Sequence, residues 1–356
     1  MTRLTLLGAG KIGDAIIHLL SHCGDYELTV ADNDPVRLDL IPGGRARKQM
    51  LDIRDENAVA DLLKGQDVVL SACPYYLTQS IARAALSGGT HYLDLTEDVE
   101  STRIVQRLSD GADHAFIPQC GLAPGFISIA AHDLAQRFDS LREVNMRVGA
   151  LPLYPTNALK YNLTWSTDGL INEYCNPCLA IRDGEQIETL ALEGLERFSL
   201  DGVDYEAFNT SGGLGTLTET LAGRVENLDY KTVRYPGHRD IIKILVRDLR
   251  LDRRRDLLKD VLETAIPMTL QDVVLIFVTV SGMREGRLTQ ETFAKKIYAQ
   301  EVNGRLLSAI QLTTASGICA MVDMLCEGKL PQAGFVRQED APLNTFLSNR
   351  FGRYYA

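Results

Sequence analysis

The segment LTLLGAGKIG, residues 4–13, decides the fold class of this chain. A short apolar run precedes Gly8, as in a buried strand, and apolar residues at spacings of three and four follow from Lys11, as in an amphipathic helix. In such a strand–turn–helix unit, glycines allow a tight exit from the strand, close approach of a pyrophosphate to the backbone, and close packing of the helix. The helix N-terminus then offers N–H groups to the phosphates. We therefore predict a dinucleotide-binding turn formed by Gly8, Gly10, Lys11, Ile12 and Gly13.

A carboxylate follows the second predicted strand, about 20 residues beyond the glycine turn. Asp32 comes directly after the β-rich stretch Leu28–Ala31. An acid at this place accepts hydrogen bonds from the adenosine ribose hydroxyls and repels a 2′-phosphate. Arg37 follows closely and is the kind of residue that accommodates a 2′-phosphate. We expect NAD as the cofactor, with NADP as the less favoured alternative.

The first 125 residues alternate short β-rich stretches with helical patterns, which is typical of βαβ units and a parallel sheet. We predict an N-terminal Rossmann-type dinucleotide-binding domain over residues 1–125, with the usual strand order of that fold. Strands are expected at Leu4–Leu7, Leu28–Ala31, Arg45–Met50, Val68–Ser71, His91–Leu95 and Ala115–Pro118. Helices are expected at Lys11–Ser21, Glu56–Lys64, Leu77–Ser87 and Val99–Leu108.

The pattern changes after Gly125. Long polar connections separate the strand-like stretches of the second half, which indicates an α+β substrate domain with a mainly antiparallel sheet over residues 126–309. Its strands are expected at Glu143–Gly149, Lys160–Trp165, Val233–Tyr235 and Val273–Ser281, after a helix at Ile127–Phe138. A last helix is predicted at Thr313–Cys326, with its C-cap at residues 327–329.

The composition is that of an ordinary globular protein. The chain has 356 residues, 45% hydrophobic and 24% charged, without an apolar run of the roughly 20 residues needed to span a bilayer. Its N-terminus lacks the pattern of a secretory signal, and seven cysteines fit reduced thiols better than a disulfide framework. We expect a cytoplasmic protein. The net charge of -10 argues against a nucleic-acid partner and would tolerate a cationic substrate.

Loops that follow the predicted strands supply further candidates, because ligands bind beyond the carboxyl ends of parallel strands. After the third strand, Asp52 and Ile53 are expected to flank the adenine. After the fourth, a turn is expected to run beneath the nucleotide, followed by a tyrosine that contacts the substrate. The alternative is that these are ordinary loop residues. The assigned residues are Ala72, Cys73, Pro74 and Tyr75, together with Cys120 after the sixth strand as a cofactor contact.

Three residues are candidates for proton transfer. Asp94 and Glu97 follow the fifth strand, where either could act as a base or could cap the next helix. His238 follows Pro236 and Gly237, which force a turn at a strand end. The remaining histidines are expected to be structural: His18, His22, His91, His114 and His132.

Two further motifs have a simpler interpretation than function. CNPC at residues 175–178 has the spacing of a metal or redox pair but no second pair accompanies it, so we expect no metal site. SGGLGT at residues 211–216 lacks the Lys-Ser/Thr ending of a phosphate loop. We interpret it as a substrate-binding or packing turn, with Gly213 assigned to the substrate.

Five motifs together resemble the saccharopine dehydrogenase-like proteins, and most closely their lysine 6-dehydrogenase branch. They are the glycine turn, YLDLTED at residues 92–98, CGLAPGF at 120–126, LKYNLTWS at 159–166 and RYPGH at 234–238. The resemblance covers nearly the whole chain and implies that residues 310–356 return to complete the Rossmann domain. Ala123 stands where the saccharopine-forming enzymes continue with an acid, which favours the lysine 6-dehydrogenase branch.

The resemblance implies an oxidoreductase that acts on a C–N bond. In the lysine 6-dehydrogenase reaction, NAD takes a hydride from the carbon that bears the side-chain amine, and water hydrolyses the imine to allysine and ammonia. An alkyl ammonium has a pKa near ~10.4, so a base must first remove a proton. An amino-acid substrate also carries a carboxylate, which an arginine can bind through two hydrogen bonds. The substrate contacts that we assign in these motifs are Lys160, Trp165 and Arg234.

Two other functions fit the same residues. One is reductive C–N bond formation of the saccharopine or carboxynorspermidine type. The other is a non-catalytic protein that senses NAD(H) through an intact Rossmann domain. In each case the partner is a small molecule rather than a nucleic acid or a membrane. A homodimer is expected from base rates and from the family resemblance.

Overall fold

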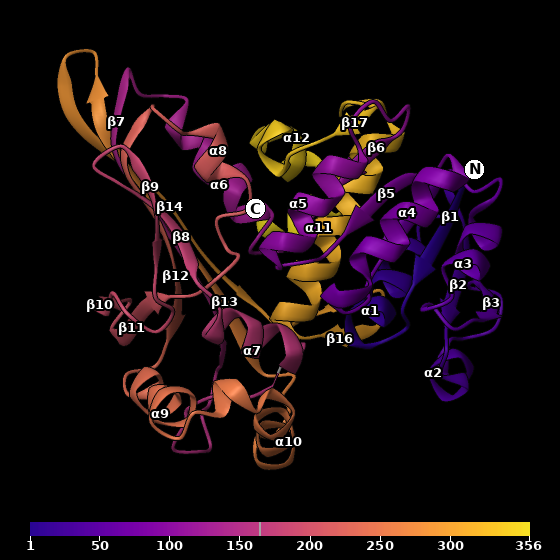
Figure 1. The fold of residues 1–356 in the computed structure, drawn as a ribbon, viewed down its shortest axis with the longest axis horizontal. Coiled ribbons are helices and arrows are strands. Elements are labelled where there is room, and N and C mark those ends of the chain that lie inside the picture. The colour runs from indigo at the N-terminus through magenta and orange to yellow at the C-terminus, as the bar shows by residue number, and fades with distance from the viewer. Residues whose placement is uncertain (164) are drawn as a thin grey trace. The chain divides into compact units, whose positions relative to one another are not determined.

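The computed structural model describes residues 1–163 and 165–356, and the chain divides into two compact units (Figure 1). Unit 1 comprises Met1–Phe126 and Gln311–Ala356, and unit 2 comprises Ile127–Ile310. Unit 1 is therefore built from two segments that are far apart in the sequence, whereas unit 2 is continuous.

Unit 1 contains a seven-stranded parallel sheet in the order β17-β6-β5-β4-β1-β2-β3. The first six strands have the order typical of dinucleotide-binding folds, so the predicted Rossmann-type fold is confirmed. The six predicted strands match β1 to β6 to within two residues at each end, whereas β17 was not predicted. The seven strands are β1 (Thr2–Leu7), β2 (Tyr26–Asp32), β3 (Arg47–Met50), β4 (Val68–Ser71), β5 (His91–Asp94), β6 (Ala115–Ile117) and β17 (Gly334–Phe335).

Aspartates begin three of the helices in unit 1. Asp34, Asp55 and Asp98 each accept a hydrogen bond from a backbone N–H in the first turn of the helix that follows. The sequence did not predict α2, because its six residues bury only Leu38 and show no apolar period. The helices are α1 (Lys11–Leu20), α2 (Pro35–Leu40), α3 (Glu56–Leu63), α4 (Thr78–Gly88) and α5 (Val99–Leu108).

The C-terminal segment packs into unit 1. Its long helix α11 (Ala309–Cys326) carries Asp323, which accepts hydrogen bonds from Tyr26 Oη at 2.6 Å and from Asn349 Nδ2 at 2.7 Å. Arg350 donates to Asp323 at 2.5 Å and also pairs with Asp25. This network joins the last residues of the chain, which follow α12 (Leu343–Ser348), to β2.

Among the described residues, α11 is the one helix whose length and apolar composition would allow it to cross a membrane. However, 83% of its 18-residue window is buried inside the protein. A core helix passes the same test of length and composition, so this is weak evidence for a membrane span.

Unit 2 contains an eight-stranded mixed sheet with a main path β10-β11-β12-β7-β13-β14, where β8 pairs with β12 and β9. All pairs are antiparallel except β12 with β7, which agrees with the predicted sheet type. The strands are β7 (Ser140–Pro152), β8 (Cys178–Arg182), β9 (Glu185–Thr189), β10 (Glu196–Leu200), β11 (Val203–Asn209), β12 (Val225–Arg234), β13 (Asp272–Arg284) and β14 (Arg287–Tyr298). The helices named below are α7 (Thr167–Cys175), α9 (His238–Lys243) and α10 (Arg255–Ala265).

The expected strand at Lys160–Trp165 is wrong. Lys160 has a positive φ of 51°, and its N–H closes a turn on the carbonyl of Asn157. Tyr161 and Leu163 are apolar and buried because they join a cluster with α7 and α10, not because they pair in a sheet. Thr164 lies outside the described residues.

The sequence also missed β8 to β11 and β14. The side chains of β9 (EQIET) are almost all exposed, and β14 alternates exposed with half-buried positions. Such strands lack the apolar run or clear alternation that identifies a strand in a sequence. The long connection expected between Trp165 and Val233 therefore contains β8 to β11 and most of β12.

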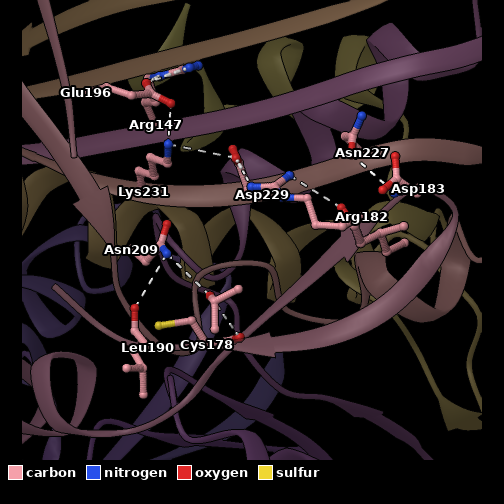
Figure 2. A network of polar contacts seen from close by, with 12 residues as sticks. Arg147, Cys178, Arg182, Asp183, Leu190, Glu196, Asn209, Asn227, Asp229 and Lys231 are labelled. Atoms are coloured by element: carbon pink, nitrogen blue, oxygen red, sulfur yellow. Dashed lines mark hydrogen bonds and ion pairs between the residues drawn. The ribbon is translucent and has the colours of Figure 1, made fainter. Parts of the chain in front are cut away.

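Alternation along β12 gives the two faces of this sheet different side chains, because successive residues of a strand point to opposite faces. On the face that carries Lys231, five charged residues form a paired network (Figure 2). Arg147 Nε donates to Glu196 at 2.8 Å, and Lys231 pairs with Glu196 as well. Arg182 Nη2 lies 2.8 Å from Asp229 Oδ2. Each cation of this charged network therefore meets a carboxylate.

Candidate functional site

The glycine turn between β1 and α1 contains two glycines that the fold itself requires. Gly8 has φ of +96°, and a Cβ there would lie 2.9 Å from the carbonyl oxygen of Ala72. A Cβ at Gly13 would lie 2.0 Å from the carbonyl oxygen of Gly8. A side chain at either position would collide with backbone, so the tight turn and the close helix–strand packing depend on both glycines.

Gly10 differs from its neighbours because the protein's own packing does not require it. A Cβ at Gly10 would meet only Arg37 Nη1, at 4.0 Å. Gly10 is also the N-cap of α1 and supplies no side-chain hydrogen bond to the first turn, where Lys11 is exposed and Ile12 half-buried. Free space at this glycine and uncapped helix N–H groups fit a bound pyrophosphate.

Asp32 connects the glycine turn to the end of β2. Its carboxylate is 3% exposed and accepts hydrogen bonds from Ala9 N at 2.7 Å and from Asp34 N at 2.9 Å. A carboxylate offers about four acceptor positions, so both oxygens can still accept a bond from a ribose hydroxyl. Asp32 thus shapes the turn in addition to any contact with the nucleotide.

The two residues expected beside the adenine differ in their exposure to solvent. Asp52 is exposed, and its hydrogen bonds with Arg54 lower the pKa of Asp52 to about 2. Ile53 is buried in the apolar core of unit 1. Ala72 lies against the glycine turn, since a Cβ on Gly8 would be 2.9 Å from its carbonyl oxygen, and Ala72 N donates to Leu7 O of β1 at 2.9 Å. Cys73 is half-buried and Pro74 exposed beside it, and a short 3-10 turn follows at Tyr75–Leu77.

Asp94 is an internal support of unit 1. It is 1% exposed, and it accepts hydrogen bonds from Tyr92 Oη at 2.6 Å, Gln119 N at 2.9 Å and Thr96 N at 3.0 Å. Burial raises the pKa of Asp94. These bonds join the ends of β5 and β6, so the geometry favours a structural role over that of a base.

The helix cap that follows β5 falls on neither residue considered from the sequence. Asp98 caps α5, with Ser101 N donating to its carboxylate at 2.7 Å. The alternative that Asp94 or Glu97 caps this helix is therefore wrong. Glu97 lies partly exposed in the loop before α5.

Cys120 is enclosed by the C-terminal segment. Its thiol donates to Ile117 O at 3.0 Å and accepts from Gln338 Nε2 at 3.2 Å, and burial raises its pKa. A Cβ on Gly317 of α11 would lie 2.8 Å from the carbonyl oxygen of Cys120. With 1% of Cys120 exposed, the structure places it in a packing contact rather than on a nucleotide surface.

In unit 2 the structure brings together Tyr161, Tyr174, Arg234 and His238, here called the Tyr174 cluster. His238 Nδ1 lies 2.9 Å from the carbonyl oxygen of Leu159, which can only accept, so Nδ1 carries the proton. Its Nε2 then accepts from the hydroxyl of Tyr174 at 3.0 Å. The same hydroxyl accepts from Arg234 Nε at 3.0 Å. A continuous chain of hydrogen bonds therefore runs from the guanidinium to the imidazole.

Arg234 and His238 are almost completely buried, at 2% and 1% exposed. The guanidinium of Arg234 lies 4.9 Å from the centre of the Tyr161 ring. Burial lowers the pKa of His238 to about 3, and the positive charge of Arg234 acts in the same direction. His238 is therefore neutral at physiological pH. After the turn at Pro236 and Gly237, His238 lies packed between aromatic rings.

The other predicted substrate residues lie around this cluster or apart from it. Lys160 is exposed, and its Nζ donates to Pro236 O at 3.0 Å. Trp165 is half-buried and donates from Nε1 to the Tyr161 hydroxyl at 3.2 Å. Gly213 packs against Tyr230, since a Cβ there would lie 2.2 Å from that ring. The sequence left two roles for Gly213, substrate binding or packing, and its contact with Tyr230 is explained by packing alone.

Tyr174 and Glu206 were not predicted as site residues. Tyr174 lies on α7, 64 positions before His238, and no local pattern connects the two. Glu206 on β11 is buried and accepts from Gly237 N at 2.9 Å and Arg239 N at 2.7 Å, which fixes the turn before His238. Across residues 1–163 and 165–356, no group of three or more His, Cys, Asp or Glu side chains is arranged to hold a metal ion.

Two family models match this chain. The saccharopine dehydrogenase NADP binding domain matches residues 4–114, and the saccharopine dehydrogenase C-terminal domain matches residues 121–351. Among solved structures, apo histidine-tagged saccharopine dehydrogenase (L-Glu forming) from Saccharomyces cerevisiae has a TM-score of 0.76 at 17% sequence identity. That likeness covers 100% of this chain and 96% of the yeast chain, and it shows the fold.

The curated relatives are longer than this chain. Saccharopine dehydrogenase [NADP(+), L-glutamate-forming] of Saccharomyces cerevisiae is 24% identical over 255 residues, which is 68% of this chain and 56% of the relative. The mitochondrial alpha-aminoadipic semialdehyde synthase of Bos taurus is 20% identical over 314 residues, 83% of this chain and 33% of the relative. The chain thus spans between a third and just over half of the length of these relatives.

Proposed function

The chain belongs to the saccharopine dehydrogenase family, whose members are oxidoreductases acting on C–N bonds, and from this premise we propose a specific reaction. The substrate is L-lysine and the oxidant is NAD. The products are NADH, ammonia and allysine, which cyclises to piperideine-6-carboxylate. The glycine turn and Asp32 support a nicotinamide dinucleotide in unit 1, and Asp32 favours NAD because a carboxylate repels a 2′-phosphate.

The observation that carries the substrate assignment is the buried guanidinium of Arg234. Its hydrogen bonds go to the hydroxyl of Tyr174 and to the carbonyl of Val233, both neutral oxygens. Among the described residues no carboxylate forms a direct ion pair with Arg234, although the buried Glu173 interacts with its charge electrostatically. Such a guanidinium can bind a carboxylate through two parallel N–H donors. This supports a substrate that carries a carboxylate as well as an amine, which is an amino acid rather than a simple amine.

The bound nicotinamide would supply the hydride acceptor, and the protein supplies proton transfer and orientation. The lysine ammonium, with a pKa near ~10.4, must lose a proton before hydride transfer. In our proposal the Tyr174 hydroxyl takes this proton as it passes its own to His238 Nε2, along the hydrogen bond of 3.0 Å. A carboxylate on Arg234 would neutralise the charge that helps lower the pKa of His238. Substrate binding would thereby strengthen the base.

A second candidate is the saccharopine-type reaction, in which the nitrogen carries a second amino-acid skeleton instead of two hydrogens. It is supported by the names of the curated relatives, which include an L-glutamate-forming saccharopine dehydrogenase. The residue pattern favours lysine, since Ala123 occupies the place where saccharopine-forming enzymes continue with an acid.

An absorbance assay at the NADH band tests both candidates with the purified chain. NAD with L-lysine should give steady turnover, whereas cadaverine, which has the same amine but no carboxylate, should react far more slowly. Saccharopine is offered in parallel with NAD and with NADP. Turnover with saccharopine and none with lysine would overturn the lysine assignment in favour of the second candidate. Tight NADH binding without turnover of any amine would instead indicate a non-catalytic sensor.

A further inference from the structure

We propose that Asp34 and Arg37 together set the choice between NAD and NADP, with Arg37 as the side chain that would hold a 2′-phosphate and Asp34 as the group that restrains it. The inference deepens the proposed function, because it rests on a dinucleotide bound at the glycine turn of unit 1. It does not depend on the identity of the amine substrate.

Arg37 lies between the glycine turn and the end of β2. Its Nη1 is 4.0 Å from the position of a Cβ on Gly10 and 3.8 Å from Asp32 Oδ2. In a dinucleotide-binding fold, an acid at the position of Asp32 marks the place of the adenosine ribose. The guanidinium is 53% exposed and thus open to a ligand at that place.

Asp34 determines where the Arg37 side chain lies. One of its oxygens caps α2 by accepting from Val36 N at 2.9 Å, and the other lies 3.3 Å from Arg37 Nε. Because Asp34 is the N-cap, Arg37 is the third residue of the helix, and its side chain returns over the first turn. Asp34 N in turn donates to Asp32, so the two carboxylates are held together on either side of one guanidinium.

The charges at this corner oppose a 2′-phosphate. Such a phosphate carries a charge of about −1.5 to −2. It would lie beside two carboxylates, while the Arg37 guanidinium is already shared between them. Removing the charge of Asp34 would reduce this repulsion and would also release Arg37 for a two-pronged bond to the phosphate. The release of Arg37 occurs only if Asp34 restrains that arginine, whereas charge repulsion would fall with or without Arg37.

The test is a double-mutant cycle on cofactor binding, measured by fluorescence titration of NADH and NADPH without any amine substrate. Asp34→Asn is the first variant, because the amide oxygen can still cap α2 while the charge is lost. Arg37→Gln is the second, and the third combines both. We expect Asp34→Asn to raise the affinity for NADPH relative to NADH by about 10-fold. In the Arg37→Gln background, Asp34→Asn should have little effect on this ratio.

Two results would overturn the proposal. One is that Asp34→Asn leaves the affinity for NADPH relative to NADH unchanged. The other is that Asp34→Asn raises this relative affinity equally in the Arg37→Gln background. Thermal unfolding of each variant shows whether the protein remains folded. The affinity for NADH shows whether the dinucleotide site at the glycine turn remains intact. Since no amine is present, a failed lysine assay leaves this test unaffected, whereas loss of all dinucleotide binding in the unmodified chain would refute both proposals.

Discussion

The two faces of the sheet in unit 2 treat buried positive charge in opposite ways. On one face, Lys231 is only 7% exposed but lies in the charged network with Glu196 and Asp229. On the other face, three residues later in the same strand, Arg234 bonds to a hydroxyl and a carbonyl. Both positions carry the cost of removing a cation from water. Lys231 offsets it through carboxylates in direct contact, whereas at Arg234 the described residues offer no such contact and the buried Glu173 acts from a longer distance.

In our proposal, this difference separates a structural charge from one that binds the substrate. A buried cation that is neutralised by its own protein stabilises the sheet only modestly and needs nothing further. A buried cation bonded to neutral oxygens is poised for an anion from outside, and the nearby aromatic rings of the Tyr174 cluster help to tolerate it until then. Substitutions on the two faces should therefore affect different measurements.

Arg234→Met should give the largest effect, and on catalysis. The methionine keeps much of the buried volume but cannot bind a carboxylate, so kcat/KM for L-lysine should fall by about 10² to 10³, equivalent to roughly 3–4 kcal/mol. Turnover of cadaverine should change far less. Steady-state assays of both amines make the comparison. Equal losses for the two amines would show that Arg234 does not bind the substrate carboxylate.

Lys231→Met should act on stability instead. Glu196, which is half-buried, and Asp229, which is buried, each lose one cation. The free energy of unfolding should therefore fall by about 2 kcal/mol. Activity per folded molecule should stay the same. Urea denaturation measures the loss, with Arg182→Met as the matched control. Because the Arg182 side chain is 38% exposed, its pair with Asp229 should contribute about 1 kcal/mol or less. A larger loss from Arg182 than from Lys231 would contradict this ranking.

The third effect concerns pH. The folded-state pKa of His238 is lowered to about 3, so between that value and about 6.5 the unfolded chain binds a proton that the folded chain does not. The stability contributed by neutral His238 is complete above about pH 6.5 and falls as the pH drops, by about 1.4 kcal/mol per pH unit. His238→Gln should remove this slope in urea denaturation between about pH 5 and 6.5. His22→Gln, at an exposed position, should retain it.

Local patterns were sufficient for most of unit 1. Parallel strands such as β4, which is buried throughout, are short apolar runs that a sequence shows directly. Unit 2 was harder because its sheet has one face lined partly by charges, as in Lys231 and Asp229, and such strands read as polar connections. The stretch Tyr161–Leu163 failed in the opposite sense, since its apolar side chains are buried by packing without strand pairing.

The part of the candidate site that depends on backbone shape was the most predictable from the sequence. The glycine turn reveals itself in sequence because few residues other than glycine tolerate its geometry at Gly8 and Gly13. The Tyr174 cluster depends on side chains that meet through the fold, so the sequence indicated His238 but not its partner Tyr174. Likewise, the position of Asp94 at a strand end did not reveal that the protein's own donors occupy its carboxylate.

The division of unit 1 into two segments has a consequence for how the protein is made. Unit 2 is encoded without interruption, so all of its residues leave the ribosome before α11 is complete. Until the last residues follow, β6 has no β17 beside it, and Asp25 and Tyr26 lack Arg350 and Asp323. The sheet of unit 1 is therefore begun before unit 2 and completed after it, with β6 left as an open edge in between.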